Sequence, residues 1–224
     1  MSSIAKAAAI GTAIFVAFAT DGVAQQRRRQ FSFYHASRAS AGASQAISQF
    51  AGHTLDRLRF IRPDVEVRVF ASDFPLPEHR EAVAARNRAL ALVESEATPD
   101  NGGFRIRNRV YLGLLQEQLQ FEPVVIELLY SPNEFGTAQD VFTALAEYAM
   151  AVEERRALTA ARTVLTPGNT GAMRNRLILA RDAVTTAERR ENRTGRRADL
   201  LRHLGELRRA IDEFIAALPS GANR

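Results

Sequence analysis

Three titratable side chains lie close together in the sequence, at Asp73, Glu78 and His79. They follow VEVRVF, a run typical of a strand, and α/β proteins often place ligand-binding groups just beyond such strands. They are therefore the candidates for an enzyme site assembled only in the folded chain. The alternative is a structural role at the start of a helix, because the backbone dipole favours acidic groups there. The sequence favours this second explanation, and we predict no catalytic residue.

Other familiar chemistries have no matching residues. The histidines lie far apart without the H-E-x-x-H spacing, although a zinc site needs three or four convergent ligands. The stretch Gly168–Gly171 lacks the Lys-Ser/Thr of a phosphate loop, and no G-x-S-x-G is present. The absence of cysteine removes disulfides and thiolate chemistry. We expect no cofactor and no metal.

Two sets of arginines could contact an anionic partner. The first set alternates along one predicted strand, and the second lies in the last two predicted helices. The candidate contacts are Arg105, Arg107, Arg109, Arg189, Arg190, Arg196 and Arg197. For the first set the favoured alternative is a solvated sheet face that deters edge pairing. In the helices, interspersed Asp and Glu indicate a surface of salt bridges, although net positive charge remains.

The stretch Arg88–Tyr130 predicts three strands of one sheet, around which the rest of the chain is organised. The first two runs, Ala89–Thr98 and Phe104–Leu115, flank an Asn-Gly turn at Pro99–Gly103, a strong hairpin signal. The second run alternates with period two. Its predicted apolar face carries Phe104, Ile106, Val110 and Leu112, opposite the arginines. A third run, Pro123–Tyr130, can join the same sheet.

The segments before this stretch predict strands that alternate with helices. In chain order we expect a strand at Phe31–His35, a loop at Ser37–Ser44, a helix at Ser44–Phe60, a strand at Val65–Phe70 and a short helix after Pro75 and Pro77. The order is then β-α-β-α-β-β-β. Helical crossovers imply parallel pairing and the hairpin is antiparallel, so the fold class is α/β with a mixed sheet.

From Thr137 onward the sequence predicts three helices. Breaks are expected at Thr166–Asn169 and at Arg190–Gly195. Each helix has one apolar stripe, so none is stable alone, and the three should pack on each other or on the sheet. The expected organisation is an α/β domain over residues 31–135 and a helical region over residues 137–218.

The amino-terminal segment resembles a secretory signal. Lys6, the only lysine, precedes the apolar run Ala7–Ala19, and small residues at Gly22 and Ala24 predict cleavage after Ala24. The run is shorter than the about 20 residues of a membrane span. Arg27–Arg29 beyond the cut opposes translocation, so an uncleaved inner-membrane anchor at residues 4–19 is the alternative. The expected location of the mature protein is the periplasm.

The composition allows one substantial core but leaves the partner open. The chain has 224 residues, 46% of them hydrophobic, and a formal charge of +5 that is carried almost entirely by arginine. Arginine richness can indicate anionic partners or can reflect codon bias.

The run VEVRVFASDF, a short helix and ALALVESEATPDNGGFRIRNRVYLGLL together resemble the amino-terminal α/β domain of TolB-like envelope proteins. In that family a strand of the form V-L-x-G-S-V precedes a D/N-G turn and a strand of the form R-V-x-V-x-x-x-L. Leu92–Glu96 and Phe104–Leu115 correspond to the two strands, and the resemblance covers Phe31–Tyr130. The propeller of TolB is missing, and the tail shows no repeat of about 34 residues. The resemblance implies an envelope or assembly role and no active-site residue.

Three hypotheses follow for function. The preferred one is a non-enzymatic periplasmic protein that acts as a binding or scaffold module, with another envelope protein as its partner. The alternative is an arginine-mediated binder of nucleic acid or anionic membrane, in which an exported protein would meet lipid rather than nucleic acid. The third is an enzyme that uses Asp73, Glu78 and His79.

Overall fold

The structure, a computed structural model, describes residues 29–61, 63, 65–101, 103–112, 124–129, 132–194 and 197–219. Along the chain these form β1 (Arg29–His35), α2 (Ala41–Ile61), β2 (Val65–Ala71), η1 (Pro77–His79), α3 (Arg80–Asn87), β3 (Ala89–Asp100), β4 (Gly103–Leu112), β5 (Val124–Leu129), α4 (Pro132–Ala160), α5 (Pro167–Thr194) and α6 (Ala198–Ala217). The predicted order of strands and helices, and the three carboxy-terminal helices, are confirmed.

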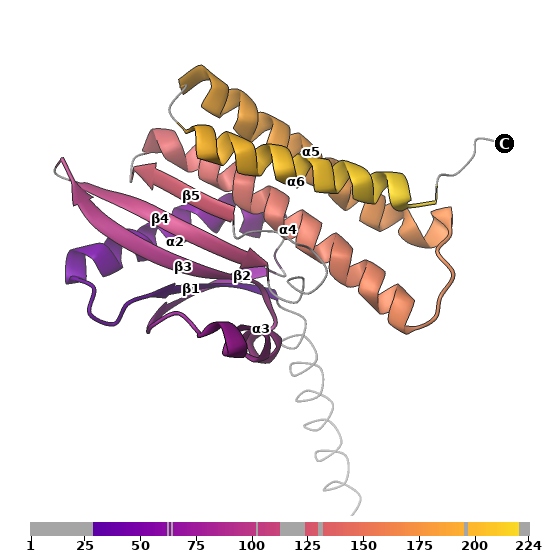
Figure 1. Ribbon diagram of the computed structural model, residues 1–224, viewed down its shortest axis with the longest axis horizontal. Coiled ribbons are helices and arrows are strands. Elements are labelled where there is room, and N and C mark those ends of the chain that lie inside the picture. Colours follow the sequence, from indigo (N-terminus) through magenta and orange to yellow (C-terminus); the bar gives the residue numbers. More distant parts are fainter. Residues whose placement is uncertain are drawn as a thin grey trace, which may run out of the picture.

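The five described strands form one mixed sheet in the order β2-β1-β3-β4-β5. Strand β1 pairs in parallel with both β2 and β3, whereas β4 is antiparallel to its neighbours. Helices α2 and α4 cover one face of the sheet, which we call the core face, and α3 covers part of the opposite, outer face (Figure 1). Because β1 is covered on both sides, its residues from Gln30 to His35 are all buried.

Helix α2 begins at Ala41, three residues earlier than predicted. The Ser40 hydroxyl accepts a hydrogen bond from the Ala43 amide at 3.2 Å, which caps the first turn. Gly42 suits this turn because a Cβ there would lie 3.1 Å from the Phe104 ring of the hairpin. The predicted loop at 37–44 is therefore shorter, and its second half is helical.

The hairpin turn is tighter than predicted. Strand β3 continues through Pro99, and Asp100 pairs with Gly103, so only two residues form the loop. Asn101 adopts φ 43°, a left-handed conformation that asparagine tolerates better than most residues. The predicted apolar face of β4 also omitted Asn108, which is completely buried and accepts a hydrogen bond from the Ser95 hydroxyl at 2.7 Å.

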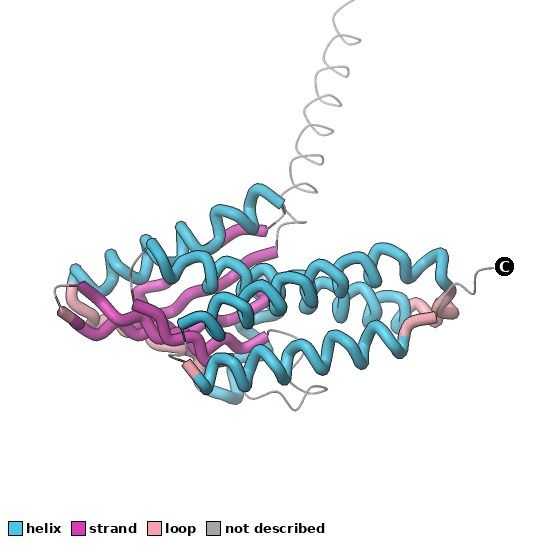
Figure 2. Tube along the Cα trace, turned by 90° about the horizontal axis from the view of Figure 1, so that it is seen from above, coloured by secondary structure: helices cyan, strands magenta, loops and turns pink. Residues whose placement is uncertain are grey.

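The carboxy-terminal helices share one hydrophobic core with the sheet. Phe142 of α4 lies 5.7 Å, ring centroid to centroid, from both Phe31 and Phe33 of β1. Helix α5 packs on α4, α6 packs on α5 and reaches β5, and the three helices extend beyond one end of the sheet (Figures 1 and 2). Within the described ranges, the tail therefore lies on the sheet and does not stand apart from it.

Several boundaries of these helices differ from prediction. The break predicted at Thr166–Asn169 lies earlier, at residues 161–166, because α4 ends at Ala160 and α5 already begins at Pro167. Helix α4 starts at Pro132 and not at Thr137, since proline is well accommodated at the first helical position. Helix α5 continues to Thr194 through the predicted break at Arg190–Gly195. The buried Glu191 side chain, which accepts hydrogen bonds from Thr137 and Arg197, holds this last part of α5 against the bundle.

The predicted signal or anchor at residues 1–24 lies outside the described residues. In the part of the chain that is described, no helix has both the length and the apolar character to cross a membrane.

Candidate binding groove

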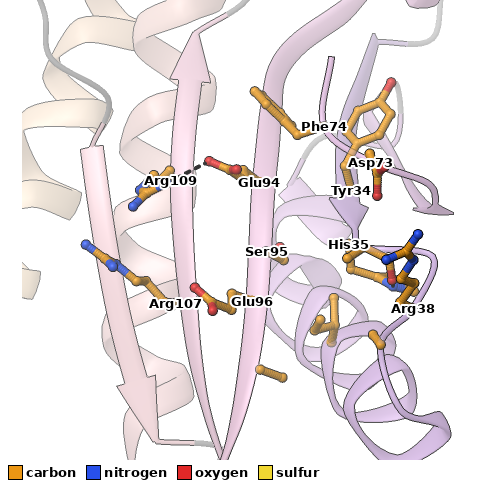
Figure 3. A pocket seen from close by; sticks show the side chains of 14 residues that line it. Tyr34, His35, Arg38, Asp73, Phe74, Glu94, Ser95, Glu96, Arg107 and Arg109 are labelled. Atoms are coloured by element: carbon orange, nitrogen blue, oxygen red, sulfur yellow. Dashed lines mark hydrogen bonds and ion pairs between the residues drawn. The ribbon is translucent and has the colours of Figure 1, made fainter. Parts of the chain in front are cut away.

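A hollow of about 610 Å³ opens beyond the carboxyl end of β1, and we call it the groove. Its lining comes from the end of β1 and the following loop, from the segment after β2, from the middle of β3 and from the outer face of β4. The lining residues that carry polar or aromatic groups are Tyr34, His35, Arg38, Asp73, Phe74, Glu94, Ser95, Glu96, Arg107 and Arg109. Figure 3 shows Arg107 and Arg109 on one side of β3, and His35, Arg38 and Asp73 on the other.

The topology of the sheet creates this groove. The chain leaves β1 toward α2 on the core face, but leaves β2 toward α3 on the outer face. Neighbouring parallel strands whose connections diverge in this way leave a crevice at their carboxyl ends, the usual ligand position in α/β proteins. In addition, β1 pairs with β3 only as far as Glu94, whereas β3 continues to Asp100. The second half of β3 therefore forms one wall of the groove.

An aromatic cluster fixes one end of the groove. The Tyr34 ring stacks on Phe70 at 4.9 Å, and Phe74 stacks on Tyr111 at the same centroid distance. The Arg80 guanidinium lies 4.4 Å from the Tyr111 centroid and 4.9 Å from that of Phe74, within cation–π range. Because Phe74 is held in this cluster, the neighbouring Asp73 is held at the groove.

The groove carries charged groups of both signs, and four of them have no partner among the described residues. The side chains of Arg38, Asp73, Glu96 and Arg107 take part in no hydrogen bond or ion pair with other described residues. Of the charged residues that line the groove, Arg109 and Glu94 form the one ion pair among described residues, with 3.2 Å between Arg109 Nη1 and Glu94 Oε2. The groove therefore offers two cations and two carboxylates to an occupant.

The floor of the groove contains neutral polar groups. The Tyr34 hydroxyl accepts a hydrogen bond from Asn87 Nδ2 at 3.3 Å. Burial raises the pKa of Tyr34, an effect that this hydrogen bond opposes. The phenol thus stays neutral at physiological pH. Ser95, which is 5% exposed, uses its hydroxyl to bond Asn108 beneath it.

The structure separates the three titratable residues singled out in the sequence. Asp73 lines the groove, whereas Glu78 and His79 are exposed on η1 and are not among its lining residues. The histidines are also dispersed, and no three His, Asp or Glu side chains of the described ranges gather where they could hold a metal ion.

The arginines of the hairpin have different surroundings. Arg105 binds Asp100 Oδ2 at 2.8 Å, and Arg109 binds Glu94. Arg107 lines the groove and has no ion pair among the described residues. Of the predicted hairpin contacts, Arg107 is therefore the cation that an occupant of the groove could reach without first breaking an ion pair.

Most arginines of the tail are used within the protein. Arg197 makes two hydrogen bonds of 2.8 Å to Glu191, which is 1% exposed, and Arg190 lies 3.0 Å from the buried Asp140. Arg189 is exposed and has no ion pair among the described residues, while Arg196 lies outside them. Further arginines of this region that bond to other parts of the protein are Arg174, Arg176, Arg181, Arg202 and Arg208. These contacts reduce the positive charge available to an external partner.

Arg38 and Glu96 line the groove but were not predicted from the sequence. Arg38 stands in the loop that directly follows the first strand, the kind of position where parallel sheets bind ligands, so its position was a usable signal. Glu96 gave no such signal, because its place in the groove depends on where β1 ends relative to β3.

Comparison of the chain with protein-family profiles, with curated proteins and with solved structures finds no match. The assignment of function therefore depends on the groove and on the physical properties of the chain.

Proposed function

We propose that this chain is a non-enzymatic protein of the periplasm or cell envelope that binds another protein through the groove. The observation that carries the proposal is a set of charged side chains, Arg38, Asp73, Glu96 and Arg107, that line a hollow of about 610 Å³ and form no ion pair with another described residue. Charged groups that face a concave surface and lack internal partners become favourable contacts when a partner supplies the opposite charge.

A polypeptide fits this groove better than nucleic acid or an anionic lipid surface. Nucleic acid and anionic lipid both favour sites in which positive charge dominates. The groove instead is lined by both basic and acidic side chains. Many arginines of the tail are bound to carboxylates or carbonyl groups of the protein itself. A protein segment carries both donors and acceptors and can match both signs. Location in the envelope is part of the proposal and is supported by the signal-like residues 1–24.

The absence of cysteine makes a site-specific test direct, because one introduced thiol is the only one in the chain. Glu96→Cys places it in the groove, and Asp182→Cys places it on an exposed position of α5 as the matched control. Each variant is expressed in its native host, and a thiol-linked photo-cross-linker is attached in isolated envelopes. We expect a protein adduct of one defined mass from position 96 and none from position 182.

The outcome also tests the alternatives. Equal adducts from both positions, or none from position 96, would contradict protein binding in the groove. An adduct to nucleic acid or lipid would instead support the arginine-mediated function. Intact-mass measurement of the fractionated protein tests the location: a periplasmic species that starts at Gln25 supports export, and a species confined to the cytoplasm would contradict it.

A further inference from the structure

Among the described residues, no strand pairs with the second half of β3 on the edge that faces β1. The last residue pair between β1 and β3 is Tyr34 with Glu94, yet β3 continues to Asp100. Ser95–Asp100 covers roughly 20 Å at about 3.3 Å per residue. On its other edge this segment is paired with β4 throughout. A strand position in line with β1 is thus not filled by any described strand, and we call it the open strand position.

The backbone of β3 directs hydrogen-bonding groups into the open strand position. Antiparallel ladders alternate, so residues whose N–H and C=O groups point to the partner strand alternate with residues whose groups point away. The two-residue turn makes Asp100 and Gly103 a hydrogen-bonded pair. Because such pairs recur at every second residue, the backbone N–H and C=O groups of Thr98 and Glu96 also point to β4. The groups of Ala97, and the carbonyls of Ser95 and Pro99, are then directed away from β4.

The position of Pro99 agrees with this assignment. Proline has no N–H, so within sheets it is placed where the missing donor would face an open edge. Pro99 lies opposite Phe104, a pair of the type that makes no ladder hydrogen bonds, so its nitrogen faces the open strand position. Proline also ends the pairing, which limits an added strand to a few residues beside Ser95–Ala97.

The walls of the groove define the side chains of an occupant. A strand added here would place alternate side chains on the core face and on the outer face. On the core face they would meet Ile47 and Ala97, which are apolar. On the outer face they would meet the charged Glu96, with Arg107 of β4 across β3 from them. Strand β1 already has such a pattern in line with this position, with its phenylalanines on the core face and Ser32 on the other.

From these observations we infer that the groove binds its partner by strand addition. The occupant is a short extended segment of a partner protein, with apolar residues at every second position and charged residues between them. It pairs with the β3 edge at Ser95–Ala97, and its charged side chains lie beside Glu96, with Arg107 of β4 across β3 from them. Backbone pairing supplies affinity in such complexes, and the alternating side chains supply specificity. This inference rests on the proposed function and adds the mode of binding.

The test uses a displayed library of random peptides of about ten residues, selected on the intact protein. We expect enriched peptides in which apolar residues occupy every second position. Amide hydrogen exchange is then measured with and without the selected peptide. The Ala97 amide should exchange at least about tenfold more slowly in the complex, because it gains a hydrogen bond. The Thr98 amide, which is directed to β4, should exchange at the same rate in both states and serves as the internal control.

A substitution gives a second readout of the same hydrogen bond. Ala97→Pro removes the N–H but leaves the ladder to β4, since this N–H points away from β4. It should weaken peptide binding about tenfold or more, while Asp182→Ala on α5 should leave it unchanged. If Ala97→Pro fails to fold, the amide exchange of Ala97 in the unmodified protein still shows whether the bound peptide pairs with β3.

The inference is overturned if no peptide is enriched, if the enriched peptides have a helical period of three to four, or if Ala97 exchanges equally fast in the complex. When any of these results accompanies a protein adduct from Glu96→Cys, the protein-binding function stands and only the strand-addition mode is wrong. When that adduct is also missing, the function itself is wrong.

Discussion

At the scale of single residues, buried carboxylates are held by arginines, and this pairing explains much of the arginine content of the tail. Glu191 is 1% exposed and Glu147 is completely buried, and each has an arginine beside it, Arg197 and Arg176 respectively. A buried carboxylate without a cation is costly, so these arginines are needed for stability whatever the protein binds.

Removal of Arg197 tests this role. Arg197→Ala should lower the free energy of unfolding by about 3 kcal/mol, because the buried Glu191 loses its two-bond partner. The matched control is Arg189→Ala, an exposed site without an ion pair among the described residues, where the change should stay within about 0.5 kcal/mol. Urea unfolding followed by circular dichroism measures both, and equal losses would contradict the assignment.

The ionisation of the Tyr148 phenol can be measured separately, because its pKa is raised to about 12. Burial, together with the nearby charge of Glu213, raises its pKa to about 12, although Arg155 lowers it. In the unfolded chain the phenol ionises near pH 10, so the free energy of unfolding should fall as the pH rises from about 10 toward 12. Phenolate absorbance is recorded immediately after rapid jumps to a series of alkaline pH values, before the protein unfolds. One tyrosine should ionise near pH 12, and this step should be missing in Tyr148→Phe. A late ionisation that persists in this variant would contradict the prediction.

At the scale of elements, two helical glycines should respond in opposite ways to the same substitution. A Cβ at Gly136 of α4 would lie 2.6 Å from Arg190 Nη1, whereas no described atom beyond its own helical turn lies within 4 Å of a Cβ at Gly205 of α6. Alanine favours a helix by about 1 kcal/mol over glycine. Gly205→Ala should therefore raise the free energy of unfolding by about that amount.

Gly136→Ala should lower the free energy of unfolding by about 1 kcal/mol, although alanine has a better helix propensity than glycine. The new methyl group would push Arg190 away from the buried Asp140, 3.0 Å from its Nε atom. Thermal unfolding compares the two variants under the same conditions. If both substitutions stabilise the protein to a similar degree, the Arg190–Asp140 ion pair contributes little to the free energy of unfolding.

Secondary structure was readable from the sequence where periodicity was strong. The sequence predicts one apolar stripe on each tail helix, and in α5 it is completely buried and consists of Met173, Leu177, Ala180, Val184 and Ala187. Boundaries were less accurate, because they depend on contacts that periodicity does not encode. Ser40 caps α2, which begins three residues before the expected start, and Glu191 keeps α5 helical through a polar stretch.

The groove could be predicted only in part. Asp73 was identified because it follows a strand, but Glu78 and His79 accompany it only in sequence. The open edge of β3 could not be derived from the sequence, since it results from the parallel register of Tyr34 with Glu94. Non-local pairing of this kind leaves no local pattern of residues.

At the scale of the whole molecule, one core joins the sheet to the carboxy-terminal helices. We therefore expect a single cooperative unfolding transition, with the same midpoint by far-ultraviolet circular dichroism and by tyrosine fluorescence. Leu145→Ala, at a completely buried position of α4, should shift both midpoints together and cost about 2–5 kcal/mol. Two separate midpoints would show that the helices and the sheet unfold independently.

The central claim is that a protein partner binds in the groove, and the most direct test is the dissociation constant of that partner. The partner identified by cross-linking from position 96 is titrated by calorimetry into the wild type, into Arg107→Glu and into the tail control Arg193→Glu. We predict at least about tenfold weaker binding for Arg107→Glu, or about 1.4 kcal/mol, and a change within about twofold for Arg193→Glu. Equal affinities of Arg107→Glu and the wild type, or a larger loss with Arg193→Glu, would contradict binding in the groove.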